Sequence, residues 1–354
     1  MNDHPEPSRS KRTLGSRLAR FLLKVVGAFL ALIVLAAIAF NIYLSTRPSP
    51  RFVRPAGTIK VPAPFRVGRA FIDYMTMDGQ RLYAGYTSHG LVSVINTATG
   101  QPAGTVAGMG RIHGTAVVAD RNLGFASDSG DNTVAVFDLS TQQVLQKIPA
   151  GMDPDAIIYD RKLNLIYAGN HDGKTATLID ADTRKVVANI QLGGEPEYPE
   201  ADPATGIIYQ NLEDTSELVV VDPQRQAVTQ RYKLGPCQGP TGLALDAATH
   251  RLFSACRSKH LVVLNSDTGE IVAELPIGAG VDGVDYDPVL RRVYTANAIG
   301  NMTVIQQDSA DQYRVLENAP GHFGGHSLVI DPSTHRIYVA YFGSIAVYDA
   351  VPQP

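Results

Sequence analysis

The stretch GLALDAATHRLFSACRSKHLVVLNSDTGEIVAELPIG, residues 242–278, contains the pattern that decides the fold. It opens with a short apolar run that ends at Asp246, and a second run follows around Leu252–Phe253. A third run, rich in valine, ends at Asn265, and a Thr-Gly turn leads into a fourth. Short apolar runs separated by turn residues at intervals of about 8–12 residues indicate antiparallel β-strands.

The same unit recurs seven times. An aromatic residue marks the second strand of each copy, and successive markers are 42, 42, 42, 44, 41 and 44 residues apart. The markers are Tyr83, Phe125, Tyr167, Tyr209, Phe253, Tyr294 and Tyr338. An aspartate precedes each marker by five or seven residues: Asp78, Asp120, Asp160, Asp202, Asp246, Asp287 and Asp331. Four strands in a period of about 42 residues are typical of a propeller blade, so we predict an all-β fold, a seven-bladed β-propeller with four-stranded antiparallel blades.

The seventh copy ends after three strands, near Asp349–Ala350. The segment AGTIKVPAP near residue 58 resembles the fourth strands of other copies, such as VANIQLGGE. We therefore expect Thr58–Val61 to complete the last blade, which closes the ring and removes an open sheet edge.

The repeats DPATGIIYQN, NTVAVFDLSTQQVLQKI and LVVLNSDTGEIVAELPIG resemble the YVTN-type (YncE-like) seven-bladed propeller repeat. The resemblance covers residues 57–354 and is specific for architecture rather than for chemistry. It implies an exported bacterial protein of a family with largely unassigned activity, some of whose members bind ligands or nucleic acid. Lactonase and metal-dependent lyase propellers are more distant lookalikes, and none of their diagnostic motifs is found here.

The N-terminal region predicts a membrane anchor. Residues 25–44 form a 20-residue apolar stretch, long enough for a helix to cross a bilayer, and a basic tail at residues 1–24 precedes it. Positive charge favours the cytoplasmic side, so the propeller is expected in the periplasm or outside the cell, tethered to the bacterial inner membrane as a single-pass signal anchor. A cleaved signal peptide with a site at Ala37–Ala39 is the alternative. Residues 45–56, with three prolines, are predicted to be a stiff linker.

Charge is divided unevenly. Residues 1–54 carry a net charge of +7 and the remaining 300 residues a net charge of −10. An acidic body repels phosphate backbones, so nucleic acid is an unlikely partner. The absence of Trp argues against true WD repeats, and no motif of a nucleophile elbow or a phosphate-binding loop is found.

Polar residues recur where each innermost strand begins. The position five residues before each repeat aspartate holds Asp73, Thr115, Asp155, Glu197, Thr241, Asp282 and His326. Strand-start residues often cap turns and face water. A ring of them can also surround a pocket for a polar ligand at the mouth of the central channel, and loops on a rigid frame commonly carry function.

Two further groups of residues are candidates for this face. Period-2 alternation places Glu200 and Asp285 in the channel. Two carboxylates in a narrow channel should raise the pKa of one of the two groups or attract a cation. His113, His322 and His326 lie on loops entering inner strands, and imidazoles beside carboxylates can hold a divalent metal ion. His89 and His171, and the arginines Arg66, Arg69, Arg111 and Arg257, map near the same face.

These residues predict a ligand-binding or protein-interaction module that acts through its channel mouth. The alternative is a metal-assisted hydrolase, lactonase or lyase on the same face, using His113, His322 or His326 with Asp155, Glu197 or Asp282. Convergence of two histidines and a carboxylate on one point within about 4 Å would favour the metal. A spread around the rim would favour ligand binding.

The chain has two cysteines. Cys237 lies in the loop entering the inner strand of the fifth blade and Cys256 at the end of the neighbouring strand. This arrangement permits a disulfide, and an oxidising compartment would favour it, so we predict a Cys237–Cys256 bond. Two separate thiols are the alternative.

Overall fold

The computed structural model describes residues 14–46, 49–62 and 71–352, and the chain divides into two compact units, Met1–Ser49 and Pro50–Pro354. In the first unit, helix α1 (Leu14–Thr46) includes the whole predicted apolar span. No helix among the residues whose side chains are described is both long and apolar enough to cross a membrane. Part of the basic tail, together with Arg66 and Arg69, lies outside the described residues.

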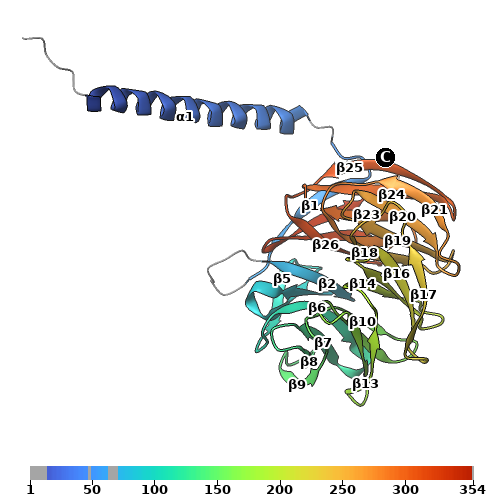
Figure 1. Cartoon of the computed structure of the whole chain (residues 1–354). Coiled ribbons are helices and arrows are strands. Elements are labelled where there is room, and N and C mark those ends of the chain that lie inside the picture. Colours follow the sequence, from blue (N-terminus) through green and yellow to red (C-terminus); the bar gives the residue numbers. More distant parts are fainter. Residues whose placement is uncertain (1–13, 47–48, 63–70, 353–354) are drawn as a thin grey trace, which may run out of the picture. The chain divides into compact units, whose positions relative to one another are not determined.

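The second unit is a seven-bladed β-propeller (Figure 1). Each blade is a four-stranded antiparallel sheet, as the repeat predicts. Blades one to three are β2 (Ile72–Asp78), β3 (Arg81–Tyr86), β4 (Leu91–Asn96) and β5 (Gln101–Val106); β6 (Ile112–Val118), β7 (Leu123–Asp128), β8 (Thr133–Asp138) and β9 (Val144–Pro149); and β10 (Pro154–Asp160), β11 (Leu165–Asn170), β12 (Thr175–Asp180) and β13 (Lys185–Gln191).

Blades four to six continue the same order. They are β14 (Pro196–Ala201), β15 (Ile208–Leu212), β16 (Glu217–Asp222) and β17 (Ala227–Lys233); β18 (Pro240–Asp246), β19 (Arg251–Cys256), β20 (His260–Asn265) and β21 (Ile271–Pro276); and β22 (Val281–Asp287), β23 (Arg292–Asn297), β24 (Asn301–Ser309) and β25 (Gln312–Pro320). The seventh blade contains β26 (Gly325–Ile330), β27 (Arg336–Tyr341) and β28 (Ser344–Ala350).

The start of the propeller closes the ring. Strand β1 (Val53–Lys60) pairs antiparallel with β28 as the outer strand of the seventh blade, with Ile59 opposite Ile345. The predicted closure is confirmed, and the strand begins at Val53, five residues before the expected Thr58. A bulge between Pro55 and Gly57 lets the pairing continue past Pro55, which cannot donate a backbone hydrogen bond.

The hydrophobic core lies between blades. The described part of the chain contains seven buried clusters, and each combines side chains from two adjacent blades. Each repeat aromatic belongs to the cluster that its blade shares with the next, as Tyr83 does with Phe137 of blade two. A blade cannot bury both faces alone, so the aromatic recurs in every copy to fill the gap to its neighbour.

Candidate functional site at the channel mouth

A β-bulge interrupts the first strand of every blade at the same place. The register between the first and second strands shifts directly after the residue that opens the inner strand, for example after Ile72, Pro154 and Val281. A bulge bends the strand and re-aims the side chain that follows. The first residue inside each bulge forms what we call the inner ring: Asp73, His113, Asp155, Glu197, Thr241, Asp282 and His326.

Six of these seven residues are those expected from the repeat, and blade two differs. Counting back from Asp120 gives Thr115, but the bulge in β6 begins after Ile112, so His113 takes the ring position. The count fails because Asp120 lies in a 3₁₀ turn (Ala119–Arg121), beyond the end of the strand. Thr115 is instead buried and lines a second pocket farther along the channel.

A second set of mouth residues lies one position past the end of each second strand. This outer ring comprises Thr87, Ser129, His171, Glu213, Arg257, Ala298 and Phe342. In each of blades one to six, the backbone N–H of the outer-ring residue donates to a backbone carbonyl of the same blade. That carbonyl belongs to the residue two positions before the inner-ring residue, as in the bond from His171 to Asp153. Every member stands four residues after a repeat aromatic, and counting forward from the aromatics would have identified Glu213.

Asp73 lies at the centre of one half of the inner ring. Its Oδ2 is 2.6 Å from His113 Nδ1 and its Oδ1 is 2.9 Å from His326 Nε2. His113 Nδ1 is also 2.8 Å from Asp155 Oδ1, and His326 Nδ1 contacts Asp282. Three carboxylates and two imidazoles from five blades thus alternate around the mouth.

Tyr74 and Arg257 link the remaining positions. The Tyr74 hydroxyl donates across the mouth to Glu197 Oε2 at 3.2 Å and to Asp155 Oδ2 at 3.4 Å. The Arg257 guanidinium contacts Glu213 and lies 3.7 Å from Asp282 Oδ1 and 4.0 Å from Glu197 Oε1. The charged groups and the Tyr74 hydroxyl consequently form a closed circuit.

The circuit shifts the pKa values of its members in opposite directions. Burial alone would lower the pKa of His113, but the charges and hydrogen bonds of Asp155 and Asp73 outweigh burial and raise the pKa to about 10. Hydrogen bonds from His113 and His326 overcome burial and lower the pKa of Asp73. The pKa of Glu197 is raised by burial and by the nearby charges of Asp155 and Asp282.

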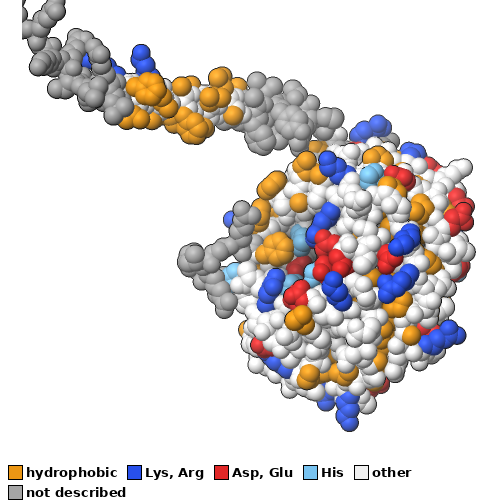
Figure 2. All heavy atoms as spheres, viewed as in Figure 1, with side chains coloured by type: hydrophobic (Ala, Val, Ile, Leu, Met, Phe, Trp, Pro, Cys, Tyr) orange, Lys and Arg blue, Asp and Glu red, His pale blue; other side chains and the backbone are white. Residues whose placement is uncertain are grey.

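These side chains line a pocket of about 330 Å³. Its lining has six carboxylic acids, three histidines, two arginines and two aromatic residues: Asp73, Asp153, Asp155, Glu197, Glu213, Asp282, His113, His171, His326, Arg111, Arg257, Phe71 and Tyr74. Figure 2 shows acidic side chains gathered at the centre of the propeller face, with histidine and basic side chains beside them. Such a pocket can recognise polar groups of either sign.

The channel narrows directly below the ring. Blades one and four place Tyr74 and Tyr198 one residue after the ring position, with their ring centroids 5.4 Å apart. Blades five and six have Gly242 and Gly283 there, and a Cβ on Gly283 would lie 2.6 Å from the backbone nitrogen of Leu328. The glycines therefore let neighbouring strands approach, and the two tyrosines divide the mouth pocket from the second pocket.

Glu200 and Asp285 lie farther along the channel. Burial, followed by the charge of Asp285, raises the pKa of Glu200 to about 8. Burial also raises the pKa of Asp285 to about 7, although the N–H groups of Tyr286 and Ile330 donate to its carboxylate at 2.7 and 2.8 Å. Glu200 lines the second pocket, which has a volume of about 310 Å³.

Two other candidates are directed away from the mouth pocket. The His322 ring stacks on Tyr341, with centroids 4.1 Å apart and planes 5° apart. The Thr241 hydroxyl donates to the Val281 carbonyl at 3.0 Å. Neither residue lines the mouth pocket.

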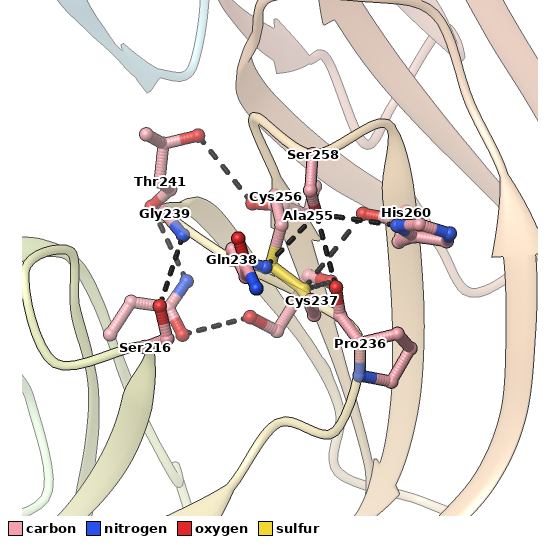
Figure 3. The surroundings of a disulfide bond; sticks show 12 residues. Ser216, Pro236, Cys237, Gln238, Gly239, Thr241, Ala255, Cys256, Ser258 and His260 are labelled. Atoms are coloured by element: carbon pink, nitrogen blue, oxygen red, sulfur yellow. Dashed lines mark hydrogen bonds between the residues drawn. A yellow bond between two sulfur atoms is a disulfide. The ribbon is translucent and has the colours of Figure 1, made fainter.

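Cys237 and Cys256 form a disulfide in the structure, with Cα atoms 5.4 Å apart (Figure 3). Both are fully buried in the core between blades four and five. Arg257 follows Cys256 directly, and its N–H donates to the Gly239 carbonyl at 2.9 Å. The bond thus holds the loop before β18 against the end of β19, from which Arg257 extends into the mouth.

Comparison with known proteins gives information on the fold. No family model matches the sequence, and no curated protein matches it. Among solved structures, the chain is similar to hydrazine synthase from Kuenenia stuttgartiensis, with a TM-score of 0.69 and 16% identity over 80% of this chain and 97% of that chain. The similarity supports the propeller architecture.

Proposed function

We propose that the protein binds a small polar ligand in the mouth pocket of its propeller. The observation that carries this proposal is the closed circuit of charged side chains, contributed by all seven blades, around one cavity. Ion pairs that serve stability alone need not converge on a cavity, whereas clusters of perturbed pKa values in a cleft are typical of functional sites. Acids and bases in one pocket suit a ligand that offers both hydrogen-bond donors and acceptors.

A thermal-shift panel tests this function. Purified full-length chain is heated with amino acids, small amines, hydroxy acids and sugars, and at least one class should raise the melting temperature. A ligand at 100 times its Kd adds about 2.7 kcal/mol of stability. The double variant Glu197→Gln/Asp282→Asn should lose this response, while Glu270→Gln, an exposed position in a distant turn, should keep it. The proposal fails if no class stabilises the wild type, or if the double variant responds equally.

The protein is further proposed to be an exported, membrane-anchored member of the YVTN-type (YncE-like) propellers, with its propeller on the periplasmic side of a bacterial inner membrane. The apolar run of residues 25–44 and the preceding basic tail support the anchor and its direction. Helix formation over Leu14–Thr46 is compatible with such a span. The repeat sequences support the family.

Cell fractionation tests the anchor. The full-length chain should sediment with membranes, and protease should reach the propeller only from the outer side. A soluble mature chain that begins near Phe40 would instead identify residues 1–39 as a cleaved signal peptide.

One observation favours metal-assisted hydrolase, lactonase or lyase chemistry as a second function. Asp73, His113 and Asp155 present donor atoms that all lie within 4.8 Å of one another. Each of the donor sets found in the described residues contains one histidine, and His113 and His326 reach different oxygens of Asp73. Two histidines therefore do not converge on one point with a carboxylate, and the donor groups are not evenly spread around the rim either. Ligand binding accordingly remains the first proposal.

A further inference from the structure

We infer that Asp73, His113 and Asp155 form a binding site for a divalent transition-metal ion at the edge of the mouth pocket. The inference rests on the proposed function, because the ion would be part of the surface that meets the polar ligand. All three residues are more than nine-tenths buried and line the cavity.

The contacts of His113 support a ligand role. Its Nδ1 faces Asp73 Oδ2 at 2.6 Å and Asp155 Oδ1 at 2.8 Å. One ring nitrogen carries at most one proton and can donate one strong hydrogen bond at a time, so a single N–H cannot serve both carboxylates well. A cation held between Nδ1 and the two oxygens satisfies all three atoms, after small outward shifts of the side chains.

The other ring nitrogen of His113, Nε2, already has a partner that would orient the imidazole for metal binding. His113 Nε2 lies 2.9 Å from Ser129 Oγ. When Nδ1 offers its lone pair to a metal, Nε2 carries the proton and donates it to Ser129. Metal-binding histidines almost always donate their other N–H to such a partner, which fixes the tautomer and the ring orientation.

Asp73 is oriented in the same way. His326 Nε2 lies 2.9 Å from Asp73 Oδ1, which leaves Oδ2 directed toward His113. The other Asp155 oxygen, Oδ2, accepts a long hydrogen bond of 3.4 Å from the Tyr74 hydroxyl. Both carboxylates thus present one oxygen to the proposed ion and have the other in contact with a neighbour.

The donor set selects the kind of ion. One imidazole nitrogen and two carboxylate oxygens suit Zn²⁺ or Mn²⁺, whereas Mg²⁺ and Ca²⁺ prefer oxygen ligands alone. Three protein ligands leave a coordination position open, as in sites where the metal contacts a water or a bound molecule.

The test is competition for Zn²⁺ between a chromophoric chelator and full-length chain stripped of metal, with Mn²⁺ and Mg²⁺ as comparisons. We expect one Zn²⁺ per chain, and binding about 100-fold weaker or more in His113→Asn and Asp155→Asn. Ser129→Ala should weaken binding about tenfold, since loss of such a supporting contact costs 10–100-fold. His322→Asn, which changes a histidine stacked outside the pocket, should bind Zn²⁺ as the wild type does.

Melting curves of each variant show whether it is folded, and Ser129→Ala remains informative if a ligand variant is not. Absence of Zn²⁺ and Mn²⁺ binding by folded wild type, or equal binding by folded Asp155→Asn, would overturn the inference. The two proposals fail separately, because the thermal-shift panel is run on stripped and on metal-loaded protein. A polar ligand that binds without any metal site would reject only the metal.

Discussion

Single residues of the inner ring differ in what they contribute to stability. Asp73 accepts from two histidines, which lowers its pKa, so its charged form is stabilised by folding. Burial and like charges raise the pKa of Glu197, so its charged form is disfavoured. Binding sites commonly retain such destabilising groups.

This difference predicts opposite effects of two similar substitutions. At pH 8, Glu197→Gln should raise the melting temperature because it removes a carboxyl group whose ionised form is disfavoured by burial and by neighbouring carboxylates. Asp73→Asn should lower it by leaving two imidazoles poorly paired. The expected loss for Asp73→Asn is about 3 kcal/mol, as for breaking a buried ion pair. Denaturant unfolding of both variants measures the effects. Destabilisation of the same size in both would show that the ring is a structural network.

Glu200 and Asp285 predict a pH dependence of stability. Folding raises the pKa of Glu200 from 4.5 to about 8 and the pKa of Asp285 from 3.8 to about 7. At pH values between the unfolded and folded pKa of each group, the folded chain therefore binds more protons than the unfolded chain. Stability contributed by these groups therefore falls as pH rises from about 5 to 8. Glu200→Gln should melt with the wild type near pH 5 and at a higher temperature near pH 8. Parallel curves for wild type and Glu200→Gln would contradict the assignment, and Glu274→Gln, at an exposed outer strand, is the control.

Among the elements, β1 has the clearest energetic role. Ile59 on this strand packs in the core between blades seven and one, and the adjacent Lys60 is exposed. Ile59→Asp should cost about 3 kcal/mol or more, because it buries an unpaired charge at the closure. Lys60→Asp should change stability by about 0.5 kcal/mol or less. Equal unfolding curves for the two variants would argue against closure by β1.

The fifth blade carries a second prediction at this scale. The disulfide joins residues 19 apart, and a loop near this length is worth about 3 kcal/mol in the chain-entropy model. Thiol titration of denatured, unreduced chain should find no free thiol. The double variant Cys237→Ser/Cys256→Ser should be less stable and should bind the ligand of the mouth pocket more weakly, because Arg257 loses its support. Two thiols per chain before reduction would reject the bond.

The repeat made the elements predictable, because every blade must bury the same faces against its neighbours. The inner-ring positions followed from counting back five residues from each repeat aspartate, except at blade two. There Asp120 lies in a 3₁₀ turn, and the ring residue stands seven residues before it instead of five. The outer ring needed a different reference point, the repeat aromatic. Pairing within the ring depends on closure of the propeller: His326 and Asp73 are 253 residues apart and meet because blade seven adjoins blade one.

At the scale of the whole molecule, the propeller brings side chains from distant parts of the sequence to one cavity. Tyr74 and Tyr198 divide the channel, so the mouth pocket is accessible from one face of the propeller. The proposed ligand would thus meet a cavity on a rigid frame. Export to the periplasm, as proposed, would present this face to small molecules outside the cytoplasm.

The most direct test is a crystal structure of the chain with the compound that raises its melting temperature most. We predict electron density for that compound in the mouth pocket, within hydrogen-bond distance of Asp155 or Glu197 and on the open side of Tyr74. Density for the compound at another surface, with only water between the inner-ring side chains, would contradict the account.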